Sequence, residues 1–162
     1  MNRNPSRQHA GLAAVLSLGL MGAALPAWAY SDGPAPRPVE LVTAERNLDA
    51  GRPADAIAPL LSYLKQDPQN SDALTDLGRA YLQMKDYEKA RHYLEQSLAA
   101  EKSRPDTNQY LGTVYLATGE LDKAEARLAA LNHLCFFGCG DERVLKAEVA
   151  DYKKAHGLPV GK

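Results

Sequence analysis

The chain has few of the residues on which catalytic and metal sites are usually built. Its 162 residues include two cysteines, four histidines and no glycine-rich run of the kind that cradles phosphate. The serines lack the strand–turn–helix setting that a nucleophile elbow requires. We identify no catalytic constellation and predict that the protein is not an enzyme.

An excess of charge of one sign is also lacking. Nineteen lysines and arginines face twenty aspartates and glutamates, and no segment forms a basic stripe. Binding to nucleic acid relies on such a stripe, so no nucleic-acid partner is predicted. With 45% hydrophobic and 24% charged residues, the composition is that of a soluble globular domain with one continuous core.

Long hydrophobic runs are confined to the N-terminus. The run from Leu12 to Leu25 follows two arginines and precedes the small residues of Ala27-Trp28-Ala29. At about fourteen residues it is shorter than the roughly twenty that a membrane-spanning helix needs. We therefore predict a signal peptide over residues 1–29, cleaved after Ala29, and a periplasmic or secreted chain without a membrane span. Residues 30–38 (YSDGPAPRP) predict a flexible proline-rich leader.

What the sequence does contain is an internal repeat. Shifting it against itself by 34 residues aligns three copies, at 37–70, 71–104 and 105–138. Each copy holds two amphipathic segments with small and large residues in register. The aligned residues are Ala44, Gly78 and Gly112 in the first segments, and Ala56, Ala90 and Ala124 with Leu60, Leu94 and Leu128 in the second. This period predicts helix–turn–helix units that stack on one another.

The apolar spacing places helices at 38–50, 53–66, 71–84, 87–100, 105–118 and 121–134. A further helix, from Asp141 to His156, begins like a fourth copy but has no second helix after it. Its apolar residues, Leu145, Val149 and Tyr152, would cover the open end of the third repeat. We predict a capping helix with Asp141 as its N-cap and Gly157 as its stop.

The repeat resembles that of the tetratricopeptide repeat family. The family pattern L-G-x-x-Y stands complete at residues 77–81 and 111–115, whereas the first copy departs from it at Thr43, Ala44 and Asn47. The resemblance spans all three copies. It implies an all-α tetratricopeptide-repeat α-solenoid, with three helix–turn–helix repeats over residues 39–138 and a capping helix with a short tail over 139–162.

The resemblance also implies a function. Family members bind an extended or helical segment of another protein in a concave groove lined by the first helices, so we expect a non-catalytic, monomeric scaffold whose partner is a protein or peptide. The groove residues given by this analogy are Glu45, Asp49, Thr75, Arg79, Gln83, Gln109 and Thr113. Members that grip an acidic chain terminus use several Lys, Arg and Asn there, and the acidic residues beside Arg79 do not fit that type.

The two cysteines stand in the turn before the capping helix, as Cys135-Phe136-Phe137-Gly138-Cys139. In an exported protein such a pair is expected to form a disulfide, and the spacing across a turn permits it. Two alternatives stay open. The pair could bind copper(I) together with His133, or act as a redox pair, which would make the chain a copper- or thiol-handling accessory factor. No other cofactor is predicted.

Overall fold

The computed structural model describes residues 36–159, and every regular element in this part of the chain is an α-helix. The predicted signal peptide, and the leader up to residue 35, lie outside the described residues. The seven helices are α1 (Val39–Asp49), α2 (Pro53–Leu64), α3 (Ser71–Gln83), α4 (Tyr87–Ala100), α5 (Pro105–Ala117), α6 (Leu121–Leu134) and α7 (Gly140–Ala155). None of these helices is long and apolar enough to cross a membrane.

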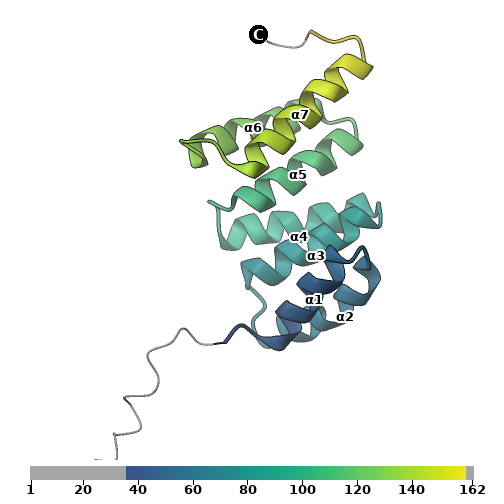
Figure 1. Ribbon diagram of the computed structural model, residues 1–162, viewed down its shortest axis with the longest axis vertical. Helices are drawn as coiled ribbons and strands as arrows, with labels where there is room; N and C mark the ends of the chain where they lie inside the picture. Colours follow the sequence, from purple (N-terminus) through teal and green to yellow (C-terminus); the bar gives the residue numbers. More distant parts are fainter. Residues whose placement is uncertain (1–35, 160–162) are drawn as a thin grey trace, which may run out of the picture. The chain divides into compact units, whose positions relative to one another are not determined.

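The helices stack in chain order (Figure 1). Each helix packs on the next, and each first helix also packs on the first helix of the following repeat: α1 on α3, α3 on α5, and α5 on α7. The helices α1, α3, α5 and α7 therefore form one layer, and α2, α4 and α6 form the layer behind it. This is the predicted arrangement of stacked helix–turn–helix repeats.

The turns within the three repeats share one backbone geometry. Gly51, Lys85 and Gly119 have positive φ angles of 68°, 62° and 79°. In each turn, the residue that follows the positive-φ residue donates its backbone amide to the carbonyl of the residue five positions before it. In the middle repeat, Asp86 N donates to Tyr81 O at 2.9 Å. This pattern closes a helix with a left-handed residue, for which glycine is preferred. The middle repeat uses a lysine there.

The buried apolar residues form two clusters that share Tyr81 at their border. We call them the N-terminal and the C-terminal cluster. The N-terminal cluster holds Leu41, Ala44, Leu48, Ala56, Leu60, Ala73, Leu77 and Ala80. The C-terminal cluster holds Ala90, Leu94, Leu111, Val114, Tyr115, Leu116, Ala124, Leu131, Leu145 and Val149.

The small residues of the repeat make room for leucine side chains. A Cβ atom on Gly78 would lie 2.4 Å from Cγ of Leu94, and one on Gly112 would lie 2.5 Å from Cδ2 of Leu145. Both distances are far below van der Waals contact, so with any larger residue the leucine side chain or its helix would have to shift. In the third repeat, the space above Gly112 is filled by Leu145 of the capping helix.

The capping helix α7 covers the third repeat as predicted, with Leu145 and Val149 buried against it. The prediction of its N-cap is wrong, however. Cys139 precedes the helix and its Sγ accepts from the amide of Glu142 at 3.5 Å, so Asp141 lies within the first turn. Gly157 follows α7 with a φ of 65°, as expected for a helix stop.

Candidate functional site

The layer formed by α1, α3, α5 and α7 is the face on which a groove was predicted, and we call it the first-helix face. Four of the predicted groove residues lie where α1 meets α3. Arg79 donates from Nη2 to Oδ1 of Asp49 at 2.7 Å, and Gln83 Nε2 lies 3.5 Å from the carbonyl oxygen of Leu48. On α1 itself, Glu45 pairs with Arg37 at 2.8 Å. The structure therefore brings Asp49, Arg79 and Gln83 together.

Thr75 does not line an open surface, which corrects the sequence prediction. It is only 2% exposed, and its hydroxyl lies 2.7 Å from both Ser97 Oγ and Thr107 Oγ1. The three hydroxyls belong to α3, α4 and α5, so they join the second repeat to the third. Helical spacing placed Thr75 on the correct helix, but the neighbouring hydroxyls that enclose it come from other helices.

Gln109 and Thr113 lie on α5 where it meets α7. Gln109 is also closed off, at 7% exposure, and it donates from Nε2 to Thr113 Oγ1 at 3.0 Å. Thr113 in turn donates to Oε2 of Glu148 on α7 at 2.5 Å. Burial raises the pKa of Glu148, and this hydrogen bond opposes the rise.

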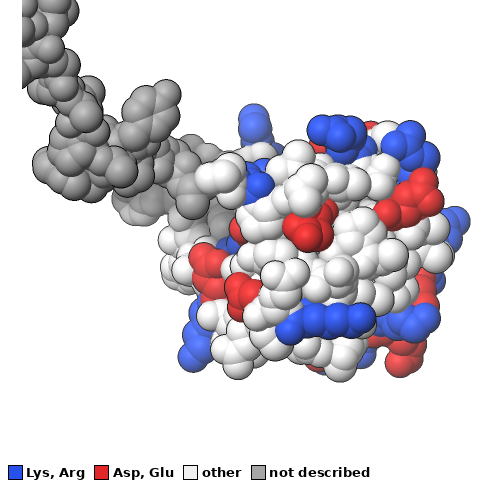
Figure 2. All heavy atoms as spheres, turned by 90° about the horizontal axis from the view of Figure 1, so that it is seen from below, with Lys and Arg blue, Asp and Glu red and all other residues white. Residues whose placement is uncertain are grey.

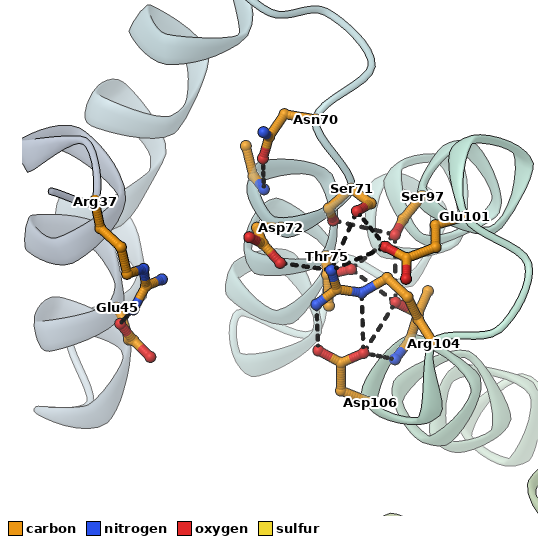
Figure 3. Close-up of polar contacts among 12 residues, drawn as sticks. Arg37, Glu45, Asn70, Ser71, Asp72, Thr75, Ser97, Glu101, Arg104 and Asp106 are labelled. Atoms are coloured by element: carbon orange, nitrogen blue, oxygen red, sulfur yellow. Dashed lines mark hydrogen bonds and ion pairs between the residues drawn. The ribbon is translucent and has the colours of Figure 1, made fainter. Parts of the chain in front are cut away.

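An arginine that sequence reasoning missed organises the polar contacts between the second and third repeats (Figure 3). Arg104 precedes α5 and reaches Asp72 at 2.5 Å, Ser71 at 3.1 Å and Asp106 at 2.8 Å. Burial lowers its pKa, but the hydrogen bonds to Asp106 and Asp72 outweigh this and hold the pKa above its usual value. The sequence held one indication of this cluster: Asp72 and Asp106 are 34 residues apart and so occupy the same position in successive repeats.

Asp76 is a second residue that the sequence did not single out. Among the described residues it takes part in no side-chain hydrogen bond or ion pair, although it is half-buried on α3. Burial raises its pKa to about 6, helped by the carboxylates of Glu45, Asp72 and Asp106 and opposed by Arg79. The first-helix face thus carries a carboxylate that forms no ion pair within the described part, although Arg79 is close enough to lower its pKa.

At the α1–α2 end of the stack, charges of both signs are interspersed (Figure 2). Figure 2, which looks at the described residues from the α1–α2 end, shows acidic and basic side chains around a largely uncharged surface. No single patch of basic residues covers this end.

The structure joins Cys135 and Cys139 in a disulfide, with an S–S distance of 2.13 Å and a Cα–Cα distance of 5.5 Å. The bonded sulfurs are not thiolates, so the copper ligand set of Cys135, Cys139 and His133 is not available in this form. The five-residue ring presents Phe136 and Phe137 outward, at 85% and 97% exposure. Within the described residues, no three His, Cys, Asp or Glu side chains are grouped to hold a metal ion.

Comparison with known proteins identifies the repeat. The sequence profile of the tetratricopeptide repeat matches residues 47–103 and 83–133. Among curated protein sequences, no significant match is found.

Solved structures show the same fold. The crystal structure of MamA matches with a TM-score of 0.64 and 24% identity, covering 74% of this chain and 67% of that one. The first repeat domain of Spaghetti (RPAP3), bound to the HSP90 peptide SRMEEVD, matches with a TM-score of 0.65 and 18% identity over 74% and 91% of the two chains. The Yersinia enterocolitica type III secretion translocator chaperone SycD matches with a TM-score of 0.64 and 18% identity over 74% and 84%. At these identities the likeness establishes the architecture alone.

Proposed function

Since the chain belongs to the tetratricopeptide repeat family, we propose that it is a non-catalytic scaffold that binds a segment of another protein on its first-helix face. The observation that carries the proposal is the continuous layer of α1, α3, α5 and α7, which offers a surface along the whole stack. A structural neighbour, the first repeat domain of Spaghetti (RPAP3), is bound to a peptide. The tetratricopeptide repeat is typically a non-catalytic scaffold, and the proposal includes no catalytic step.

The charges on this face favour a basic partner segment. Three arginines at this face are each paired with a carboxylate of the chain: Arg37 with Glu45, Arg79 with Asp49, and Arg104 with Asp72 and Asp106. Two exposed arginines of the same helices, Arg46 of α1 and Arg143 of α7, form no ion pair within the described residues. Asp76 and Glu148 likewise form no ion pair within the described residues. These two carboxylates are therefore available to a partner, and a Lys- or Arg-bearing segment complements them. The peptide SRMEEVD, which the structural neighbour binds, is acidic.

We place this scaffold in the periplasm or outside the cell, as a monomer. The support is the sequence of residues 1–29, which is typical of a cleaved signal peptide, together with a disulfide that suits an oxidising compartment. Cell fractionation with N-terminal sequencing tests this: the exported chain should begin at Tyr30. An uncleaved chain found in the cytoplasm would refute the placement.

Binding on the first-helix face is tested by peptide selection. A library of random twelve-residue peptides is selected against the purified chain, and the dissociation constants of the selected peptides are measured by fluorescence anisotropy. Asp76→Lys, which reverses an unpaired charge on the face, should weaken binding at least about tenfold. Glu88→Lys makes the same charge change at an exposed position of α4, behind the face, and should alter binding less than about twofold.

Thermal unfolding of both variants is measured alongside, so that a loss of binding is not confused with a loss of fold. Failure to select any peptide, or equal effects of the two charge reversals, would reject the first-helix face as the binding surface. The disulfide supplies a separate test. Replacing both cysteines by serine should leave peptide binding intact, because the ring lies outside this face, whereas a copper- or thiol-handling factor would lose its function.

A further inference from the structure

An open cleft of about 400 Å³ lies between α5 and α7, at the C-terminal end of the first-helix face. Its lining combines apolar atoms from both helices with two carboxylates of α7. The residues are Thr113, Leu116, Ala117, Glu148, Asp151 and Tyr152. Thr113 is one of the residues that the sequence predicted for the groove, so this cleft belongs to the predicted binding surface.

The charge of the cleft is fixed by the chain itself. Glu148 and Asp151 form no ion pair with any lysine or arginine in the part of the chain that the structure describes. Of the two lysines that follow Asp151 on α7, Lys153 pairs with Glu125 of α6 at 2.5 Å, and Lys154 forms no ion pair within the described residues. The only hydrogen bond that the described residues offer to Glu148 comes from the neutral hydroxyl of Thr113. The two carboxylates of the cleft are therefore not paired with a cation of the described residues.

The shape of the lining selects among cations. Leu116 is buried beneath the cleft, and the half-buried ring of Tyr152 stacks on His156 with centroids 4.0 Å apart, which fixes the orientation of the ring. A lining that combines apolar atoms with two carboxylates suits a side chain with a hydrocarbon stem and a charged head. Lysine and arginine have this construction, because their methylene groups pack on apolar surface while the charge stays near a carboxylate. A compact metal ion would gain nothing from the apolar lining.

We propose that the α5–α7 cleft is a subsite for one lysine or arginine side chain of the bound partner segment, with Glu148 and Asp151 holding the charged head and Leu116 and Tyr152 packing on the stem. The proposal rests on the proposed function, since it assigns one contact within the same surface. Partial burial of Glu148 strengthens the pairing, because a charge that is less well solvated interacts more strongly with a bound cation. Bound cation should accordingly lower the raised pKa of Glu148.

The test couples one change in the peptide to one change in the cleft. For each peptide selected from the random library, a set of single-substitution peptides is made. In each member of the set, one lysine or one arginine is replaced by norleucine. Norleucine keeps an apolar stem and removes the charge. At one position this should weaken binding to the wild-type chain about tenfold, and binding to the double variant Glu148→Gln with Asp151→Asn less than about twofold.

Glu148→Gln is chosen because the amide oxygen still accepts from Thr113, so the contact between α5 and α7 is kept. The matched control is Glu88→Gln with Asp122→Asn, which makes the same pair of substitutions at two exposed positions of α4 and α6, outside the cleft. In this control the norleucine effect should stay near tenfold. NMR titration of the glutamate side chains gives a second readout, in which the Glu148 pKa should fall when the lysine peptide binds and not when the norleucine peptide does.

The outcomes separate the two proposals. If Asp76→Lys weakens peptide binding more than Glu88→Lys does, but the norleucine effect is the same in the wild-type chain and in the Glu148→Gln, Asp151→Asn variant, the subsite is refuted and the binding face stands. Selected peptides without a charge-sensitive lysine or arginine would refute the subsite equally. If no peptide is selected at all, the binding face itself fails.

Discussion

Two kinds of contact hold the repeats of this fold together: aliphatic packing within the two apolar clusters, and hydrogen bonds between buried hydroxyls where the second repeat meets the third. Within each cluster the buried surface is aliphatic, with fully buried leucines such as Leu60 in the N-terminal and Leu131 in the C-terminal cluster. Where the second repeat meets the third, the structure buries hydroxyls beside the leucines, and Thr75 contacts Ser97 and Thr107. Aliphatic burial is non-directional, whereas hydrogen bonds require defined partners. The clusters therefore supply the stability of the repeats, and the polar junction fixes how they align.

The first prediction tests the clusters. Leu60→Ala and Leu131→Ala should each lower the free energy of unfolding by about 2–5 kcal/mol, because each leaves a cavity among buried side chains. Urea denaturation measures the loss. Hydrogen exchange then locates it: protection should fall most in α1–α3 for Leu60→Ala and in α5–α7 for Leu131→Ala. Equal loss of protection over all helices in both variants would show that the clusters are one cooperative unit.

The second prediction tests the polar junction. Arg104→Ala should lower the free energy of unfolding by about 2–3 kcal/mol, since it removes the cation that Asp72, Glu101 and Asp106 share. Urea denaturation followed by circular dichroism should also show a broader transition, because the second and third repeats are less firmly joined.

The matched control is Arg52→Ala, whose exposed contacts with Asp55 at 3.4 Å and Asn47 at 2.7 Å should together contribute less than about 1 kcal/mol. If Arg104→Ala and Arg52→Ala lowered the free energy of unfolding by similar amounts, the contacts of Arg104 would contribute no more to stability than an ordinary surface ion pair does.

The third prediction concerns Asp76, which lies on the first-helix face near the junction. Folding raises its pKa from 3.8 to about 6, so the folded chain holds this proton more tightly than the unfolded chain does. The contribution of Asp76 to the free energy of unfolding therefore falls as the pH rises from about 4 to about 6. Above that range the carboxylate is ionised in both states, and the full destabilisation is present. Asp76→Asn should raise the free energy of unfolding by about 1–2 kcal/mol at pH 7 and change it little at pH 4.

Chemical denaturation of the wild-type chain and the variant at both pH values measures this difference. A gain that is the same at pH 4 and pH 7 would show that the titration of Asp76 is not its source. If Asp76→Asn also weakens binding of a basic peptide, the residue is an instance of stability given up for function.

The helices and the site were not equally predictable from the sequence. Every predicted helix lies within two residues of the observed one, because apolar spacing and turn residues act locally. The enclosure of Thr75 was missed, since periodicity assigns a residue to a helix face but does not say which side chains of other helices stand opposite. Arg104 was missed because it precedes a helix, where no periodicity applies. The N-cap role of Cys139 depends on how the disulfide turn positions its sulfur.

The last and smallest predicted effect compares the middle turn with the outer two. Lys85 adopts the same left-handed conformation as Gly51 and Gly119, at a cost of roughly 1 kcal/mol that glycine avoids. Lys85→Gly should therefore raise the free energy of unfolding by about 0.5–1 kcal/mol, and Gly119→Lys should lower it by about as much, as measured by urea denaturation. Because the backbone hydrogen bonds of the two turns match, the two effects should be opposite in sign and similar in size. A loss of stability in Lys85→Gly would show that the lysine side chain contributes more to the middle turn than its backbone strain costs.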